Sequence, residues 1–210
     1  MHVDFLTAQI DPQRRCELKG MTPQDVLDFW FGAPGSAGYG KPREVWFKKS
    51  DVFDQAIRAR FFLLYELAAD GRLAAWDVTP HALLALIIVC DQFPRNMFRD
   101  DPRAFATDDR ALAAAQRMVE LGWDMQLAPI GRQFVYLPFE HAEDLALQQR
   151  GLELFQRVTE DPVLADAAVW ARKHLDIIAR FGRFPHRNAI LGRDSTPEEI
   201  EFLTQPGSSF

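Results

Sequence analysis

The stretch Tyr136–Asp144 holds the residues of this chain that are best placed to do chemistry, because it combines a proline, a histidine and three acids. A helix that begins at Phe139 places Glu140 and Asp144 on one face, since residues four apart lie on the same stripe. That stripe continues with apolar or small residues at helical spacing: Leu147, Gly151, Leu154 and Val158. Carboxylates that point inward need a cationic partner or a ligand, because burying an unpaired charge is unfavourable. The spacing therefore predicts a polar pocket at the start of this helix.

Positive charge gathers in the segment 180–193, which contains four arginines and one histidine but no acid. The helix before this segment ends near Gly182, and a helix that runs antiparallel to its predecessor returns its end to the predecessor's start. We therefore predict that one cavity is shared by two acids and two arginines: Glu140, Asp144, Arg183 and Arg187. Arginine forks in such a cavity would bind a carboxylate or a phosphate.

A third polar group ends the apolar run His81–Gln92, where Asp91 and Gln92 occupy the last turn of a helix that should be buried. The favoured hypothesis is a cleft that binds a small anionic or zwitterionic molecule without a cofactor. Its candidate ligand-binding residues are Asp91, Arg95, Asn96, Glu140, His141, Asp144, Arg183, His186, Arg187 and Asn188.

Two other interpretations fit the same residues. In a metal-assisted hydrolase, His141 and Asp144 would share a helix face and His174 would complete the site, although no dense metal-binding motif occurs. In a helical scaffold that binds a peptide or a protein partner, the ionic cluster would be purely structural. His174 also has a structural use as a hydrogen-bonded core histidine. Whether the chain is an enzyme therefore stays open.

Helices must position these residues, since no alternating strand pattern of useful length occurs. Cap signals and helical periods predict helices over Pro23–Phe31, Asp51 to Gly71, His81–Gln92, Thr107–Leu121, Phe139 to Thr159, Pro162 to Gly182 and Pro197 to Thr204. We expect Pro94 to end the buried helix and Arg95–Arg103 to form turns. The predicted fold is all-α, one domain of about eight helices packed as antiparallel hairpins over residues 21–210. Residues 1–20 are predicted to be an N-terminal extension.

Composition limits the partners. The net charge of -6 gives no basic field, so nucleic-acid binding through phosphate neutralisation is not expected. The longest apolar run, Ala82–Cys90, is about half of the roughly 20 residues that a membrane span requires. Two cysteines, Cys16 and Cys90, are too few for a disulfide framework, and no export signal is recognisable. We expect a cytoplasmic protein, and the composition predicts no oligomeric state.

Five strings carry a resemblance to a known family: DFWFG at 28–32, DQFPRNMF at 91–98, AFATD at 104–108, YLPFEHAED at 136–144 and FGRFPHRN at 181–188. In this order they resemble the uncharacterised bacterial family called domain of unknown function 924. The resemblance covers the chain from roughly residue 24 to its C-terminus. It implies a helical fold similar to tetratricopeptide-repeat proteins, with a right-handed superhelix of hairpins, but it implies no reaction. One departure is Ala142, where the family leads us to expect serine, so chemistry that needs a hydroxyl there would be missing.

Overall fold

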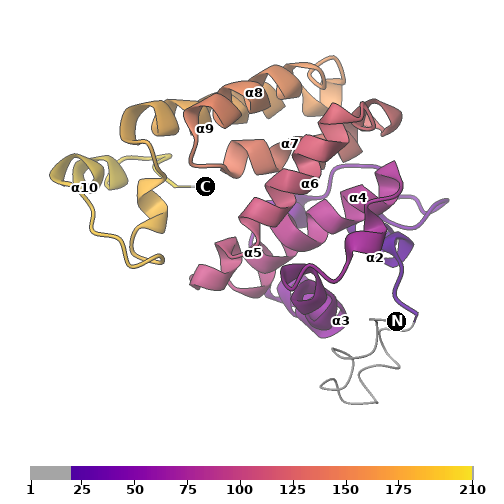
Figure 1. Cartoon of the computed structure of the whole chain (residues 1–210). Helices are drawn as coiled ribbons and strands as arrows, with labels where there is room; N and C mark the ends of the chain where they lie inside the picture. Colours follow the sequence, from indigo (N-terminus) through magenta and orange to yellow (C-terminus); the bar gives the residue numbers. More distant parts are fainter. Residues whose placement is uncertain (1–19, 210) are drawn as a thin grey trace.

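The computed structural model describes residues 20–209, and the regular structure within them is helical (Figure 1). Its α-helices are α2 (Pro23–Phe31), α3 (Asp51–Ala69), α4 (Pro80–Ile87), α5 (Phe93–Met97), α6 (Asp108–Glu120), α7 (Pro129–His141), α8 (Leu145–Gln156), α9 (Ala167–Phe181) and α10 (Pro197–Leu203). A π-helical segment, η4 (Ile88–Gln92), joins α4 to α5 without a break, so the described chain forms eight helical segments. The predicted all-α fold is confirmed. Apart from Gly20, the predicted N-terminal extension lies outside the described residues.

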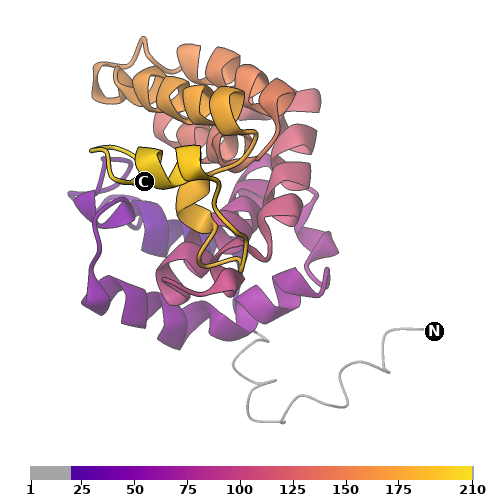
Figure 2. The ribbon, with the colours of Figure 1, turned by 90° about the vertical axis from the view of Figure 1, so that its left-hand side faces the viewer.

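The helices α6, α7, α8 and α9 pack against one another in chain order, while α4 packs on both α2 and α6, and α3 packs on α5. The C-terminal segment with α10 stands at one side of these helices (yellow in Figures 1 and 2). These contacts show a single helical domain. They do not show a right-handed superhelix like that of tetratricopeptide-repeat proteins, which stays a prediction. Within the described residues, no helix is both long enough and apolar enough to cross a membrane.

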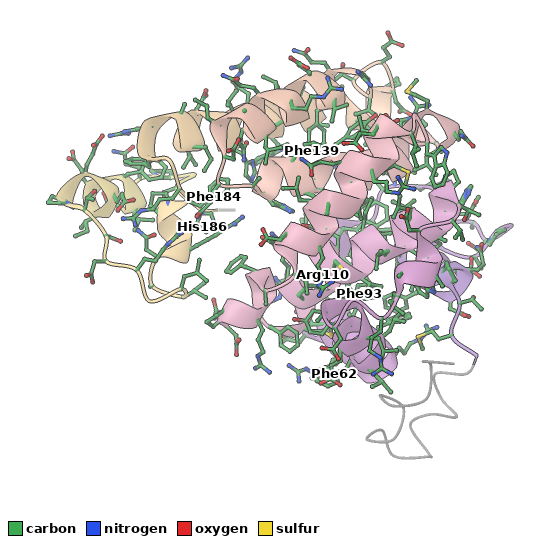
Figure 3. The ribbon with its side chains drawn as sticks, in the orientation of Figure 1. Phe62, Phe93, Arg110, Phe139, Phe184 and His186 are labelled. Carbon is green, nitrogen blue, oxygen red and sulfur yellow. The ribbon has the colours of Figure 1, made fainter. Side chains whose placement is uncertain are left out.

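Aromatic side chains form the centre of the core. Trp30 is fully buried, and its ring lies 5.8 Å from that of Trp46 and 5.5 Å from that of Phe134. Phe93, at the start of α5, contacts the same group with 5.8 Å between its ring and that of Trp30 (Figure 3). A smaller apolar cluster around Phe184 anchors the C-terminal segment to α9. Burial of these large rings is the main favourable contribution to folding.

Pro94 does not end the buried helix, and this sequence prediction is wrong. Proline has no N–H to donate to the Cys90 carbonyl, so the backbone widens into η4, where the Phe93 N–H donates to the Ile88 carbonyl. Thr107 Oγ1 donates to the Cys90 carbonyl instead, at 2.6 Å. Two neighbouring carbonyls are satisfied in the same way, Asp91 by Arg95 and Gln92 by Asn96. The chain therefore stays helical to the end of α5, where turns were expected.

The helix predicted to begin at Phe139 is also wrong, because α7 begins ten residues earlier, at Pro129, and ends at His141. Ala142 is extended, with φ -73° and ψ 136°, and Asp144 then caps α8 by accepting the Leu147 N–H at 2.9 Å. Glu140 and Asp144 therefore lie on different helices. Glu140 is buried in the last turn of α7, as expected for an inward acid, whereas Asp144 is an exposed cap. The prediction failed because proline usually marks the first turn of a helix, whereas Pro138 lies inside α7.

Gly151 on α8 packs directly against the backbone of α7 at Phe139 and Glu140. A Cβ atom at this position would lie 3.0 Å from Phe139 Cβ, which is too close for a rigid neighbour to accommodate without movement. We predict that Gly151→Leu lowers the free energy of unfolding by about 1–3 kcal/mol through overpacking. Urea titration followed by circular dichroism measures this. Ala146→Leu, on the exposed face of the same helix, is the matched control and should change stability by less than about 0.5 kcal/mol.

Candidate functional site

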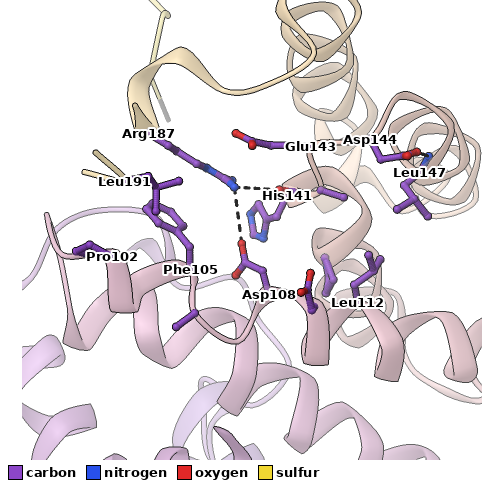
Figure 4. A pocket seen from close by; sticks show the side chains of 14 residues that line it. Pro102, Phe105, Asp108, Leu112, His141, Glu143, Asp144, Leu147, Arg187 and Leu191 are labelled. Carbon is purple, nitrogen blue, oxygen red and sulfur yellow. Dashed lines mark hydrogen bonds and ion pairs between the residues drawn. The ribbon is translucent and has the colours of Figure 1, made fainter. Parts of the chain in front are cut away.

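A cavity of about 450 Å³ opens where the start of α6, the α7–α8 junction and the segment after η8 (Pro185–Arg187) come together (Figure 4). One part of its wall is apolar, with Phe105, Leu112 and Leu191. The lining residues that carry charge or can titrate are Asp108, Asp109, His141, Glu143, Asp144 and Arg187. Three segments far apart in the sequence thus supply one polar cavity.

Asp91 lies in η4 and is fully buried next to this cavity. Its Oδ1 atom is 2.7 Å from His141 Nδ1 and 3.3 Å from Arg95 Nη1, and its Oδ2 atom accepts from Gln92 Nε2 at 2.6 Å. Burial raises the pKa of Asp91, but His141, Arg95 and these hydrogen bonds outweigh it and hold that pKa well below its usual range. Asp91 is therefore a buried anion with every side-chain oxygen bonded.

The surroundings of His141 favour its neutral form and hold the imidazole ring in one orientation. Burial and the Arg95 guanidinium lower the pKa of His141, and the opposing effect of Asp91 does not restore it. Because Asp91 is ionised, it accepts a hydrogen bond from Nδ1–H, which leaves the lone pair on Nε2. Within residues 20–209 no hydrogen bond is made to Nε2, and the ring lines the cavity. The result is a proton acceptor at the cavity wall.

Two arginines approach this pair from different sides. Arg95 forms a fork on Asp108, with N–O distances of 2.8 and 2.9 Å. Arg187 comes from the C-terminal segment; its Nη1 donates to the His141 carbonyl at 3.1 Å and lies 3.7 Å from Asp108 Oδ2 (Figure 4). The Arg187 guanidinium also lies over the rings of Phe105 and Phe184, at 4.7 and 4.4 Å. These ring faces favour a cation and fix the plane of the guanidinium.

The positive charge of Arg187 is poorly balanced by nearby acids for a side chain that is buried this deeply. Burial, and next the nearby Arg95, lower the pKa of Arg187 to about 10. Its Nε atom is buried without a hydrogen-bond partner among the described residues, and its Nη2 atom likewise makes no hydrogen bond to them. Asp108 is already held by Arg95, so it offsets only part of the charge. Arg187 therefore has one unbonded and accessible donor, Nη2, and a positive charge that is only partly balanced beside the cavity.

Only two of the four residues predicted to share a cavity line it, namely Asp144 and Arg187. Glu140 lies on the other side of α7, where its Oε1 atom is 3.0 Å from His174 Nδ1. Arg183 turns toward α10 and forks onto Glu199 at 2.7 and 2.8 Å. The shared-cavity prediction is wrong for Glu140 and Arg183, because the α9 end at Gly182 directs Arg183 to the capping box of α10.

The remaining predicted residues lie around the cavity or in the C-terminal segment. Asn96 donates to the Gln92 carbonyl in η4, and Asn188 donates to Ser195 and Glu199. The His186 ring packs at 5.6 Å from that of Phe184. These contacts connect the candidate residues to helix ends and do not place them in the cavity wall.

The residues proposed as metal ligands are not grouped as a ligand set. The Nδ1 atoms of His141 and His174 contact different carboxylates, Asp91 and Glu140, and Asp144 caps α8. Across residues 20–209, no three histidine, cysteine or acidic side chains lie close enough together to hold a metal ion.

Three charged residues of the cavity lining, Asp108, Asp109 and Glu143, were not among the predicted site residues. Asp108 begins α6 and accepts the Arg95 fork, and Glu143 accepts a fork from Arg193 at 2.6 and 2.9 Å as well as the Phe184 N–H. Both lie in strings that carry the family resemblance, which was a usable signal. Their partners are far away in sequence, so spacing alone could not pair them.

The fold and site together define an all-helical domain with a buried aspartate–histidine pair and two arginines beside a small polar cavity. The chain belongs to the family described as bacterial protein of unknown function (DUF924), whose model matches residues 26–207. Its structure is similar to that of a protein of unknown function, ATU0120, from Agrobacterium tumefaciens, with 40% sequence identity and a TM-score of 0.74. That match covers 86% of this chain and 96% of the other. Comparison with curated proteins gives no match.

Histidine burial makes stability depend on pH. Burial, and next Arg187, lower the pKa of His186 to about 4, and the pKa of His141 is lowered as well. The unfolded chain takes up these protons near pH 6.5, before the folded chain does, so the free energy of unfolding falls as the pH falls through this window. His186 alone should account for about 2 kcal/mol between about pH 7.5 and pH 5.

This pH effect is measured by urea titration at several pH values. His186→Gln should flatten the dependence, whereas His81→Gln, at an exposed position, should leave it unchanged. A wild-type free energy of unfolding that stays constant over this range would contradict the prediction.

Proposed function

We propose that this protein binds a small anionic or zwitterionic molecule in the cavity, with Arg187 as the group that receives the anion. The observation that supports this most strongly is the state of Arg187. Its side chain is only 8% exposed and lines the cavity, yet Nη2 has no hydrogen-bond partner within the described residues, and the enclosed Nε atom has none there either. Carboxylates and phosphates are the usual partners of a guanidinium fork.

The energetics of Arg187 support the same conclusion. A pKa of about 10 instead of 12.5 means that the folded protein disfavours the charged guanidinium by about 3 kcal/mol relative to water. An anion bound in the cavity would offset this unfavourable term. Ionisable groups whose environment opposes their charge are found preferentially at functional sites.

The carboxylates on the other side of the cavity support a zwitterionic ligand. Asp109 and Asp144 are both exposed and both line the cavity. Asp144 uses Oδ1 to cap α8, and its Oδ2 atom makes no hydrogen bond within residues 20–209. A ligand with an acidic end at Arg187 and an amine near Asp144 would satisfy both sides. The cavity volume of about 450 Å³ suits a molecule of this size.

The binding proposal is tested by isothermal titration calorimetry with inorganic phosphate, acetate, succinate and glutamate. We expect at least one of these anions to bind, and Arg187→Met to weaken its binding by about 10-fold or more, because a charge-assisted hydrogen bond contributes about 1.5–3 kcal/mol. Methionine keeps the apolar stem against Phe105 and Phe184. Arg183→Met is the matched control, since Arg183 pairs with Glu199 outside the cavity, and it should retain the affinity.

Stability separates this proposal from a purely structural role. If Arg187 only completes an ion network, its removal leaves buried carboxylates unpaired and should lower the free energy of unfolding by about 3 kcal/mol or more. If Arg187 is held for a ligand, Arg187→Met should be as stable as the wild type or more stable, because an unfavourable buried charge has been removed. Equal anion affinity in Arg187→Met and wild type would contradict the proposal.

A further inference from the structure

We propose that Asp91 and His141 form a catalytic dyad in which His141 Nε2 acts as a general base on water, and that the substrate is an ester of a small molecule whose anionic group binds Arg187. This inference rests on the proposed binding function and adds a reaction to the same cavity. It uses the two residues of the site for which a binding role alone gives no explanation.

The geometry supports the role of base. His141 Nδ1 is 2.7 Å from Asp91 Oδ1, and Asp91 is fully buried and held by Arg95 and Gln92 as well. The carboxylate therefore fixes the orientation of the ring and stabilises the imidazolium that forms when Nε2 takes a proton. A base that is positioned by a second group in this way is the arrangement that acid–base catalysis requires.

The lining of the cavity indicates what the base acts on. None of the described residues that line it is a serine, threonine or cysteine, so His141 has no protein nucleophile beside it to activate. Cys90 is fully buried outside the lining, and burial raises its pKa to about 12, which keeps it a thiol. Water in the cavity is then the nucleophile that the base can reach.

The reaction balances with water as the sole co-reactant. His141 Nε2 removes a proton from water while the water oxygen forms a bond to the ester carbonyl carbon, and the carbonyl oxygen becomes an oxyanion. When this intermediate collapses, the carbon–oxygen bond to the alcohol breaks, and the alcohol oxygen takes the proton from Nε2. The products are the carboxylic acid and the alcohol, with no change in oxidation state. Arg187 holds the anionic group of the substrate, and its positive charge also favours the developing negative charge.

The charged groups around His141 set the pH at which the base works. His141 faces groups from each neighbouring element: Asp91 in η4, Arg95 in α5, Asp108 in α6, His174 in α9 and Arg187 in η8. With Nδ1–H bonded to Asp91, the neutral ring is the active form. The value of kcat/KM should therefore rise with pH and level off, with a midpoint below about 6.5.

The experiment compares hydrolysis of two chromogenic esters, para-nitrophenyl hemisuccinate and para-nitrophenyl acetate, by the full chain. We expect the enzyme to prefer the hemisuccinate, which keeps an anionic group for Arg187, and Arg187→Met to lose that preference. His141→Gln should lower kcat by about 100-fold or more while succinate binding is retained. His81→Gln removes an exposed histidine and is the matched control for nonspecific imidazole catalysis, so it should retain full activity.

The outcomes separate the two proposals. If the protein binds succinate but hydrolyses the hemisuccinate no faster than buffer does, the dyad is overturned and the binding function stands. If it neither binds an anion nor hydrolyses the ester, both are overturned. Hydrolysis that His141→Gln retains overturns the role of His141. Should His141→Gln fail to fold, the wild-type reaction in heavy water decides: a general base that removes a proton from water makes kcat lower in D2O, so equal kcat values in H2O and D2O overturn the role of His141.

Discussion

The buried charge of Asp91 is the constraint on which the site depends. A carboxylate at this depth is tolerated only if cations and hydrogen-bond donors surround it, and Arg95, His141 and Gln92 meet that need from three directions. Each of these partners is in turn committed to one orientation. Arg95 also binds Asp108, and the Nε2 atom of His141 has no hydrogen-bond partner in the part of the chain that the structure describes. The position of the proton acceptor therefore follows from how Asp91 is neutralised.

Interrupted helices give the site its polar groups. Pro94 has no N–H to donate to the Cys90 carbonyl, which accepts from Thr107 instead, and the next two carbonyls also accept from side chains, those of Arg95 and Asn96. Side chains also donate to the carbonyls at the end of α7. Gln148 donates to the Glu140 and Ala142 carbonyls, and Arg187 donates to the His141 carbonyl. A cation at this point is also favoured by the negative end of the helix dipole. Arg187 thus has a structural contact through Nη1, while its Nη2 atom makes no hydrogen bond within residues 20–209.

Much of the fold could be predicted from the sequence, because helical periods and cap residues are local signals. Thr22 caps α2 and Thr196 forms the capping box of α10, as their sequences predict, and Glu140 is the inward acid that its position predicted. The errors fall where proline lies inside a helix, at Pro94 and Pro138, since local rules treat proline as a boundary. The partners of the charged residues could not be predicted, because Arg187 with Asp108 and Arg193 with Glu143 are joined by tertiary packing alone.

Ala142 limits the chemistry of the site, because its side chain has no hydroxyl group. This residue lines the cavity next to His141, and its extended backbone separates α7 from α8. Its side chain is a methyl group at the position where the family leads us to expect serine. A mechanism with a protein hydroxyl at this point is not available to this chain. The Asp91, His141 and Arg187 contacts use none of the atoms of the Ala142 side chain. The contacts of Asp91, His141 and Arg187 are therefore complete without a hydroxyl at position 142, and the proposed reaction, which uses water, does not need one.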